Sequence, residues 1–273
     1  MTHAGTDITV TSWLELQAAL FDHSWDPQLG RFRSSYVYRG SWNKSYDLST
    51  SITRLGPQYE KLEPHILRNF RKYAHSTAPQ GDTIWNWLAL AQHHGLPTRL
   101  LDWTYSPYVA LHFVTDLLDK YEEDGAVWCM DYVKSKQFLP PALLDAVNDE
   151  GASVFTPEIL APVSPTLKKL GSFQKEEFVL FLEPPSLDAR IIQQYALFSM
   201  MSDVKSELSS WLQQHPELYF RVIIPAELKW EIRDKLDQAN ITERVLFPGL
   251  AGLSKWLKRH YTHSKSGPED SLN

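Results

Sequence analysis

A single cysteine, Cys129, occurs among the 273 residues of this chain. With no second cysteine an internal disulfide is excluded, which favours a reducing compartment. The sequence also lacks any apolar run that approaches the roughly 20 residues of a membrane-spanning helix. Its first residues lack the basic segment of a signal peptide. Together these absences predict a cytoplasmic protein that has no membrane partner.

An excess of positive charge is lacking as well. The chain has 27 Lys and Arg residues against 33 Asp and Glu residues, which gives a net charge of -6. Sequence-blind binding to a nucleic-acid backbone needs a surplus of cations on one face, so an extended nucleic-acid interface is not expected. A local basic pocket, and with it a nucleic-acid end as ligand, stays open, and composition leaves the oligomeric state undecided. The 43% of apolar and 22% of charged residues indicate a folded domain with a sizeable core.

The spacing of apolar residues and of capping residues indicates a mixed α/β fold. Strands are expected at residues 36–38, 98–103, 126–130, 178–182 and 219–224. Helices are expected from Ser12 onward, around 66–74, at 83–95, from Ser106-Pro107 to about 117, and at 202–214, 226–238 and 250–261. We therefore predict one compact domain, residues 1–262, with a small mixed sheet flanked by helices. The Pro-rich stretch 137–172 is a candidate insertion or lid, and residues 263–273 a flexible tail.

The densest polar cluster runs from Gln92 to Thr104 and contains His93, His94, Thr98, Arg99 and Asp102. Gly95 and Pro97 fix the backbone between a helix end and a strand, which is how polar groups are held ready for a ligand. The structural alternative is that the histidines interact with the helix dipole and that Asp102 caps a turn or pairs with Arg99. No metal site is expected, because adjacent histidines on a helix point apart and no spaced Cys or His completes a ligand set.

Two further stretches carry polar groups with a recognisable use. Arg39 stands beside Gly40 at a strand end, where a guanidinium matches a phosphate and glycine lets a ligand or a backbone approach closely. Arg190 and Gln194 are four residues apart and share a face if this segment is helical, so that Gln194 could bind a sugar hydroxyl. A salt bridge and a surface position are the structural alternatives. Glu176, in Gln174-Lys175-Glu176, precedes a strand and is a candidate carboxylate at a sheet edge.

These stretches resemble the FRG-domain family. Its aromatic-Arg-Gly triplet is similar to Tyr38-Arg39-Gly40, with Tyr for the usual Phe, and its long middle block matches Gln92 to Phe113. A later block matches Arg190, Ile191, Gln194 and Phe198, with Ala196 where Gly is usual, and a closing segment corresponds to Leu246 to Leu253. Taken together the resemblance spans residues 11–261. Alanine in place of glycine restricts φ and is expected to shift the turn after Gln194.

At the level of fold, the order of parts is similar to that of ADP-ribosyltransferases: a strand with Arg, a helical region, a strand leading into a helix, and a later strand with Gln or Glu. This likeness implies an ADP-ribosyltransferase-like core and NAD as the substrate, with Arg39 on its pyrophosphate, Asp102 or Glu176 supplying a carboxylate, and Gln194 or Glu176 holding the ribose. Gln194 is favoured over Glu176 because it belongs to the more specific resemblance. Residues expected to line the cofactor cleft are Tyr38, Arg39, Gly40, His93, His94, Thr98, Arg99, Thr104 and Arg190.

The leading hypothesis is an NAD-dependent ADP-ribosyltransferase-like enzyme, a toxin or defence effector, that modifies a macromolecular acceptor which the sequence does not name. Two alternatives belong to other classes. A module that binds NAD or a related nucleotide without turnover would use the same cleft, and a hydrolase or nuclease would use His93 or His94 as general base. All of these readings require three distant stretches of sequence to meet around one pocket.

Overall fold

The computed structural model describes residues 4–74, 81–186 and 189–263, and within them seven strands form one mixed sheet in the order β1-β9-β6-β4-β5-β8-β7. The strands are β1 (Asp7–Thr9), β4 (Tyr36–Ser41), β5 (Leu101–Thr104), β6 (Gly125–Asp131), β7 (Val179–Leu182), β8 (Ala196–Met201) and β9 (Tyr219–Ile224). Only the pairing of β1 with β9 is parallel among these described strands. A separate hairpin joins β2 (Trp25–Asp26) to β3 (Arg31–Phe32).

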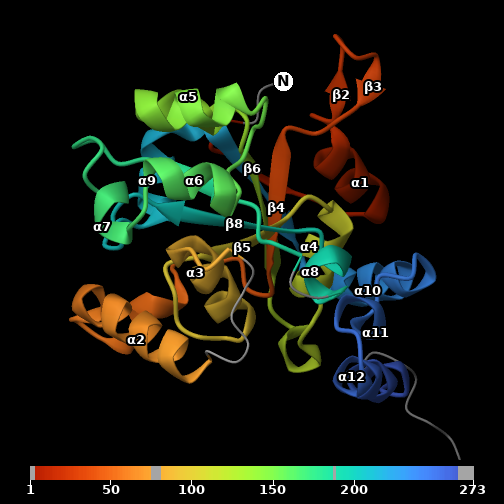
Figure 1. Ribbon diagram of the computed structural model, residues 1–273. Helices are drawn as coiled ribbons and strands as arrows, with labels where there is room; N and C mark the ends of the chain where they lie inside the picture. Colours follow the sequence, from red (N-terminus) through yellow and green to blue (C-terminus); the bar gives the residue numbers. More distant parts are fainter. Residues whose placement is uncertain (1–3, 75–80, 187–188, 264–273) are drawn as a thin grey trace, which may run out of the picture.

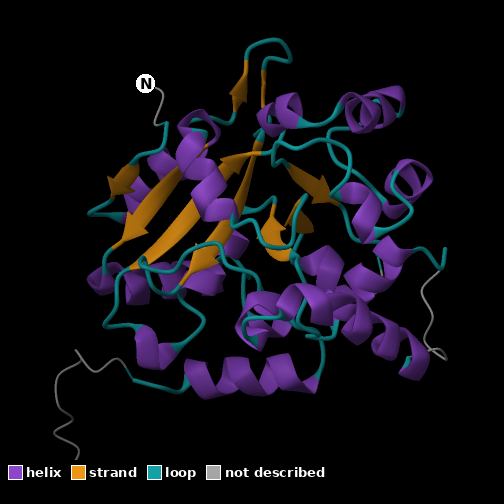
Figure 2. Ribbon diagram, turned by 90° about the vertical axis from the view of Figure 1, so that its left-hand side faces the viewer, coloured by secondary structure: helices purple, strands orange, loops and turns teal. Residues whose placement is uncertain are grey.

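Helices cover both faces of this twisted sheet (Figures 1 and 2). They are α1 (Trp13–Phe21), α2 (Tyr59–Tyr73), α3 (Ile84–His93), α4 (Pro107–Val114), α5 (Pro141–Asp149), α6 (Pro157–Val163), α7 (Leu167–Leu170), α8 (Ala189–Gln193), α9 (Leu208–Gln214), α10 (Lys229–Gln238), α11 (Glu243–Leu246) and α12 (Leu250–His260). The prediction of one compact α/β domain with a mixed sheet flanked by helices is confirmed.

Three apolar clusters make up the core. One packs α1, α4 and α10 against β4, β6 and β9, and a second packs α3 and α5 to α7 against β7 and β8. A third lies on the opposite face and includes Trp103 of β5, Trp128 of β6 and Trp211 of α9. The stretch 137–172, considered as an insertion or a lid, contributes Leu143, Phe155 and other buried side chains to the second cluster. Of the expected tail, residues 264–273 lie outside the described residues.

Several helix boundaries follow from capping groups. The Ser12 and Ser106 side chains accept hydrogen bonds from the backbone N–H three residues ahead, at the starts of α1 and α4. Thr83 forms a complete capping box with Asn86, and Gly95 just after α3 has a φ of 78°, a conformation that favours glycine. The corresponding predicted boundaries are confirmed.

Several predicted boundaries differ from the structure, and the predicted start of one helix is wrong because of a tertiary contact. The helix expected from Ser202 begins only at Leu208, because the Ser202 backbone N–H donates to the Phe178 carbonyl at 2.8 Å and continues the pairing of β8 with β7. Strand β8 itself, the central partner of β5 and β7, was not predicted from the sequence.

Candidate active site cleft

A cleft of about 790 Å³ lies where β4 and β5 separate. The two strands share a single register pair, Tyr38 with Thr104, and the pairs that would follow in a continuous ladder do not form. In their place the Arg39 guanidinium reaches across and donates a hydrogen bond of 2.7 Å to the backbone carbonyl of Asp102. The charged and amide side chains that line the cleft are Arg39, Asp47, Arg54, Gln92, Asp102, Asp116, Arg190 and Gln194. The cleft therefore brings together all three of the polar stretches, from distant parts of the chain.

Alternation along the strands places Asp102 on one face of the sheet, whereas Arg39, which pairs with Trp128, starts from the opposite face and reaches the Asp102 carbonyl across the gap between β4 and β5. Thr104 pairs with Tyr38 on one side and with Ala196 on the other, so these three residues share a face of the sheet with Asp102, two positions along β5. On this face the apolar cluster that contains α4 covers β4, and the apolar cluster that contains α3 covers β8. Asp102 is exposed between the two clusters. The cleft is thus a gap between two packed groups of helices.

Two arginines give one part of the cleft a positive charge. Burial lowers the pKa of Arg39, the charge of Asp102 opposes this, and the nearby charge of Arg54 lowers the pKa further. An arginine stays ionised despite such a shift. Arg54, on the short 3₁₀ helix Ser51–Leu55, is exposed, and its side chain has no ion pair or hydrogen bond among the described residues. Two close guanidinium groups, one held only by a backbone carbonyl, favour an anionic ligand such as a phosphate.

The Asp102 carboxylate is oriented by a short chain of hydrogen bonds. Gln92, near the end of α3, donates from Nε2 to Asp102 Oδ2 at 2.9 Å. The Thr98 hydroxyl in turn donates to Gln92 Oε1 at 2.5 Å, which fixes the orientation of the amide. Thr98 is buried and therefore acts behind the cleft wall. The carboxylate is held at the cleft surface while it stays accessible to a ligand.

The third stretch enters the cleft at the start of β8. The Gln194 backbone carbonyl accepts a hydrogen bond of 2.7 Å from the Thr104 hydroxyl, and its side-chain Nε2 donates to the Leu246 carbonyl at 3.0 Å. The turn before β8 places Tyr195, with a φ of 48°, in the left-handed region, whereas Ala196 starts the strand. We expected alanine at 196 to shift this turn. The positive φ of the turn falls on Tyr195 and not on Ala196, so the turn does not require glycine at position 196.

Some of the expected site residues lie away from the cleft. Arg99, expected to line the cleft, is buried and forms a bidentate ion pair with the buried Glu63, with Arg99 Nε donating to Glu63 Oε1 at 2.7 Å. The structural alternative, a pair between Arg99 and Asp102, does not form either. His94 is exposed just beyond α3 and does not line the cleft, whereas its neighbour His93 does. Glu176 is exposed in the segment that precedes the edge strand β7.

Tyr38 and Gly40 line the cleft but serve the fold. Tyr38 is buried, and its hydroxyl donates to the Leu20 carbonyl of α1 at 3.2 Å. A Cβ atom on Gly40 would lie 1.9 Å from the Ala110 carbonyl oxygen of α4. The glycine of the triplet is therefore required by the close approach of helix and strand.

Sequence reasoning missed several residues that line the cleft. Arg54, Trp42 and Tyr46 come from the stretch 41–56, which has no hydrophobic period, and Asp116 from the segment after α4. Their contribution depends on how this loop folds over the end of β4. No residue pattern in the loop indicates that path, so only the structure could reveal it.

Comparison with known proteins identifies the segment that forms most of this cleft. Residues 34–123 match the FRG domain family. This segment is similar to an FRG domain. It supplies Arg39, Arg54, Gln92 and Asp102, whereas Arg190 and Gln194 lie beyond the matched residues.

No curated protein and no solved structure matches the chain. In the described part of the chain no helix combines the length and apolarity needed to cross a bilayer. The same residues contain no group of three or more His, Cys, Asp or Glu side chains placed to hold a metal ion.

The buried side chain of Lys229 leads to a prediction about pH and stability. Lys229 donates from Nζ to the carbonyls of Trp42 and Lys120, each at 2.8 Å, and burial lowers its pKa from 10.5 to about 8, against the opposing charges of Glu123 and Asp124. Between these pKa values the unfolded chain binds a proton that the folded protein lacks, so the free energy of unfolding rises with pH. Urea unfolding is expected to show a gain of about 1 kcal/mol from pH 7 to pH 9 for wild type relative to Lys229→Met. Parallel pH profiles for the two proteins would contradict the assignment.

Proposed function

We propose that this protein is an NAD-dependent ADP-ribosyltransferase-like enzyme that uses the cleft between β4 and β5. The single observation that carries the proposal is that Arg39, Asp102 and Gln194, from three distant stretches, line one cleft of about 790 Å³. That volume lies within the range of small-molecule and cofactor sites, roughly 300 to 1,000 Å³. A toxin or defence effector that modifies a macromolecule is the biological setting that this proposal implies.

The two arginines would bind the pyrophosphate of NAD. Arg39 lies at the junction of β4 and β5, with one nitrogen already bound to the Asp102 carbonyl, which limits the rotation of its guanidinium. Its remaining N–H groups and those of Arg54 are suited to bind phosphate oxygens through charge-assisted hydrogen bonds. Such an arrangement holds the dinucleotide by its most charged part and leaves the sugar and the nicotinamide to the other side chains.

Asp102 and Gln194 would act on the nicotinamide ribose. Breaking the bond between ribose and nicotinamide develops positive charge on the sugar, so a nearby carboxylate stabilises the transition state more than the ground state. The chain of hydrogen bonds through Gln92 orients the Asp102 carboxylate for this role. Because the Gln194 amide nitrogen is already bound to the Leu246 carbonyl, its oxygen Oε1 is the atom that would accept a hydrogen bond from a ribose hydroxyl.

The strand order supports Gln194 over Glu176 as the third residue. Strands β4, β5 and β8 are consecutive neighbours in the sheet, and Gln194 stands two residues before β8. Glu176 precedes β7, which is separated from β5 by β8. A carboxylate at that sheet edge is poorly placed to join Arg39 and Asp102.

The direct test is release of nicotinamide from NAD by the purified chain. Wild type is expected to release it, and Asp102→Asn is expected to lower the rate about 100-fold, because the amide keeps the shape of the side chain and removes the charge. Asp149→Asn, at an exposed position on α5, is the matched control and should leave the rate unchanged. Nicotinamide release that survives in the Asp102 variant would refute the assigned role.

A comparison of the two candidate third residues gives a separate prediction. Gln194→Ala is expected to reduce nicotinamide release about tenfold through loss of one ribose hydrogen bond. Glu176→Gln is expected to leave it unchanged, since Glu176 lies outside the cleft. The reverse order of effects, measured at saturating NAD, would assign the role to Glu176.

A module that binds a nucleotide without turnover is the second candidate. It is favoured by one observation: the carboxylates among the described residues that line the cleft are all aspartates, Asp47, Asp102 and Asp116, and no glutamate is among them. Calorimetric binding of NAD with no release of nicotinamide would select this candidate. His93 lines the same cleft, so cleavage of RNA or DNA in the absence of NAD would instead indicate a hydrolase.

A further inference from the structure

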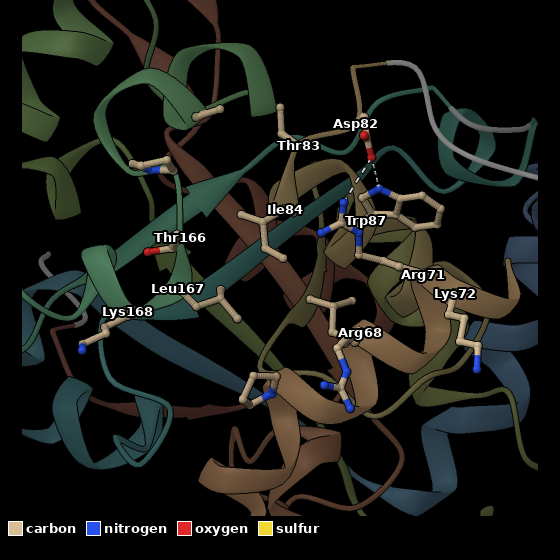
Figure 3. A pocket seen from close by; sticks show the side chains of 14 residues that line it. Arg68, Arg71, Lys72, Asp82, Thr83, Ile84, Trp87, Thr166, Leu167 and Lys168 are labelled. Atoms are coloured by element: carbon tan, nitrogen blue, oxygen red, sulfur yellow. Dashed lines mark hydrogen bonds and ion pairs between the residues drawn. The ribbon is translucent and has the colours of Figure 1, made fainter. Parts of the chain in front are cut away.

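A second and larger hollow lies on the side of the molecule formed by α2. It is an open groove of about 1070 Å³ between one face of α2 and the connection from α6 to α7, with the start of α3 between them (Figure 3). The α2 residues that line it are Pro64, Leu67, Arg68, Arg71 and Lys72, at the spacing of a single helix face. Among the described residues it shares no lining side chain with the cleft between β4 and β5. The groove is therefore a separate feature from the proposed active site.

The interior of the groove is apolar. Leu67 and Trp87 are 3% and 2% exposed, and Ile84 and Leu167 are half-buried beside them. The polar groups there are already engaged: the Trp87 indole N–H donates to Asp82 Oδ1 at 2.5 Å, and the lining threonines cap α3 and α7. A small polar ligand needs several converging donors and acceptors, which this lining does not offer. The groove is suited to apolar side chains.

Positive charges stand on both sides of the apolar strip. Figure 3 shows Arg68, Arg71 and Lys72 projecting from α2, and Lys168 on the other side of Leu167. Arg71 is neutralised by Asp82 at 3.3 Å. Arg68, Lys72 and Lys168 have no ion pair among the described residues. Asp82 is the one carboxylate in the described lining, and it is already bound.

Two of these cations repel each other on α2. Arg68 and Lys72 are four residues apart on one helix face, and like charges at that spacing destabilise a helix. The chain as a whole is acidic, with a net charge of -6, so this local surplus runs against the average composition. Unpaired positive charges around a partly exposed apolar groove are typical of a surface that binds a partner.

We propose that this groove binds an acidic amphipathic helix of a partner protein. Apolar side chains of that helix, one turn apart, enter between Ile84 and Leu167, and flanking Asp or Glu residues reach Arg68 and Lys72 on one side and Lys168 on the other. The concave shape fits a helix better than the flat surface of a membrane. An apolar strip without free hydrogen-bonding groups does not suit nucleic-acid bases, which require stacking and polar contacts.

The test uses the full chain and two labelled peptides of about 14 residues, each with leucines at i, i+3, i+4 and i+7. One peptide carries glutamates on its flanks and the other carries lysines at the same positions. Fluorescence anisotropy is expected to show binding of the glutamate peptide alone, weakened by added salt. The double variant Arg68→Glu, Lys168→Glu is expected to bind the glutamate peptide at least about tenfold more weakly and to gain affinity for the lysine peptide.

Two controls separate this site from a general charge effect and from the proposed enzyme. Lys258→Glu, at an exposed position of α12, should leave both affinities unchanged. The double variant should keep wild-type nicotinamide release, so that a failure of one proposal does not imply failure of the other. Equal binding of the two peptides, or an affinity for the glutamate peptide that the double variant retains, would overturn the proposal. If wild type and Lys258→Glu bind an RNA oligonucleotide and the double variant does not, the groove is a nucleic-acid site and the proposal is overturned.

Discussion

Replacing Arg39 by alanine is expected to lower the kcat/KM for nicotinamide release from NAD by a factor on the order of 100 to 1,000. Arg39 is the side chain that spans the gap between β4 and β5, and its charge lies close to that of Arg54. Of the two arginines proposed to bind the phosphates, only the exposed Arg54 would then remain. Arg39→Lys is expected to recover only part of the loss, because an ammonium keeps the charge but not the planar fork that binds two oxygens at once.

Controls for this prediction must separate binding from folding. The Asp102 carbonyl loses its side-chain donor in Arg39→Ala, which is expected to cost about 1 to 2 kcal/mol of unfolding free energy. Thermal melting measures that cost directly. Arg31→Ala, at an exposed position of the small hairpin, should change neither melting nor turnover. A folded Arg39→Ala protein with wild-type turnover would mean that the cleft does not bind NAD through this arginine.

Local sequence patterns predicted much of the fold, because the boundaries in question are set by local interactions. Ser12, Thr83 and Ser106 each bond the backbone within their own first helical turn, so their effect does not depend on distant contacts. The start of α9 was predicted wrongly for the opposite reason. Ser202 is drawn into pairing with Phe178, next to β7, and that competition is a tertiary interaction that propensity does not contain.

The cleft itself depends on contacts that no local pattern encodes. Strand β8 has six residues with little alternation, and its place between β5 and β7 is decided by the burial of Leu197 and Phe198 on opposite faces. Arg54 reaches the cleft only because its loop folds across the end of β4. Arg99 was expected in the site because it lies within the polar cluster, yet its partner Glu63 is 36 residues earlier, on α2. Motifs therefore located the stretches, and packing determined which side chains face the ligand.

Gly40→Ala is expected to destabilise the fold by about 3 kcal/mol, the upper end of the cost of overpacking. An added Cβ would meet the Ala110 carbonyl oxygen at 1.9 Å and the Val114 nitrogen at 3.1 Å, and both belong to the backbone of α4. No rotamer change can relieve such a contact, so the helix must move away from β4 and take Phe113 with it. Since Phe113 lines the cleft, loss of stability and loss of NAD binding are expected together.

Thermal melting of Gly40→Ala checks this prediction, with a fall of roughly 6 to 12 °C expected for a chain of this size. Gly171→Ala is the matched control: its φ of -70° suits alanine, and the nearest atom to an added Cβ, the Ser202 carbonyl oxygen, lies 3.3 Å away. That variant should melt within about 2 °C of wild type. If Gly40→Ala melts like the control, α4 can shift freely over β4. The separation of β4 from β5 would then not be fixed by helix packing, and the shape of the cleft would have to depend on the Arg39 hydrogen bond instead.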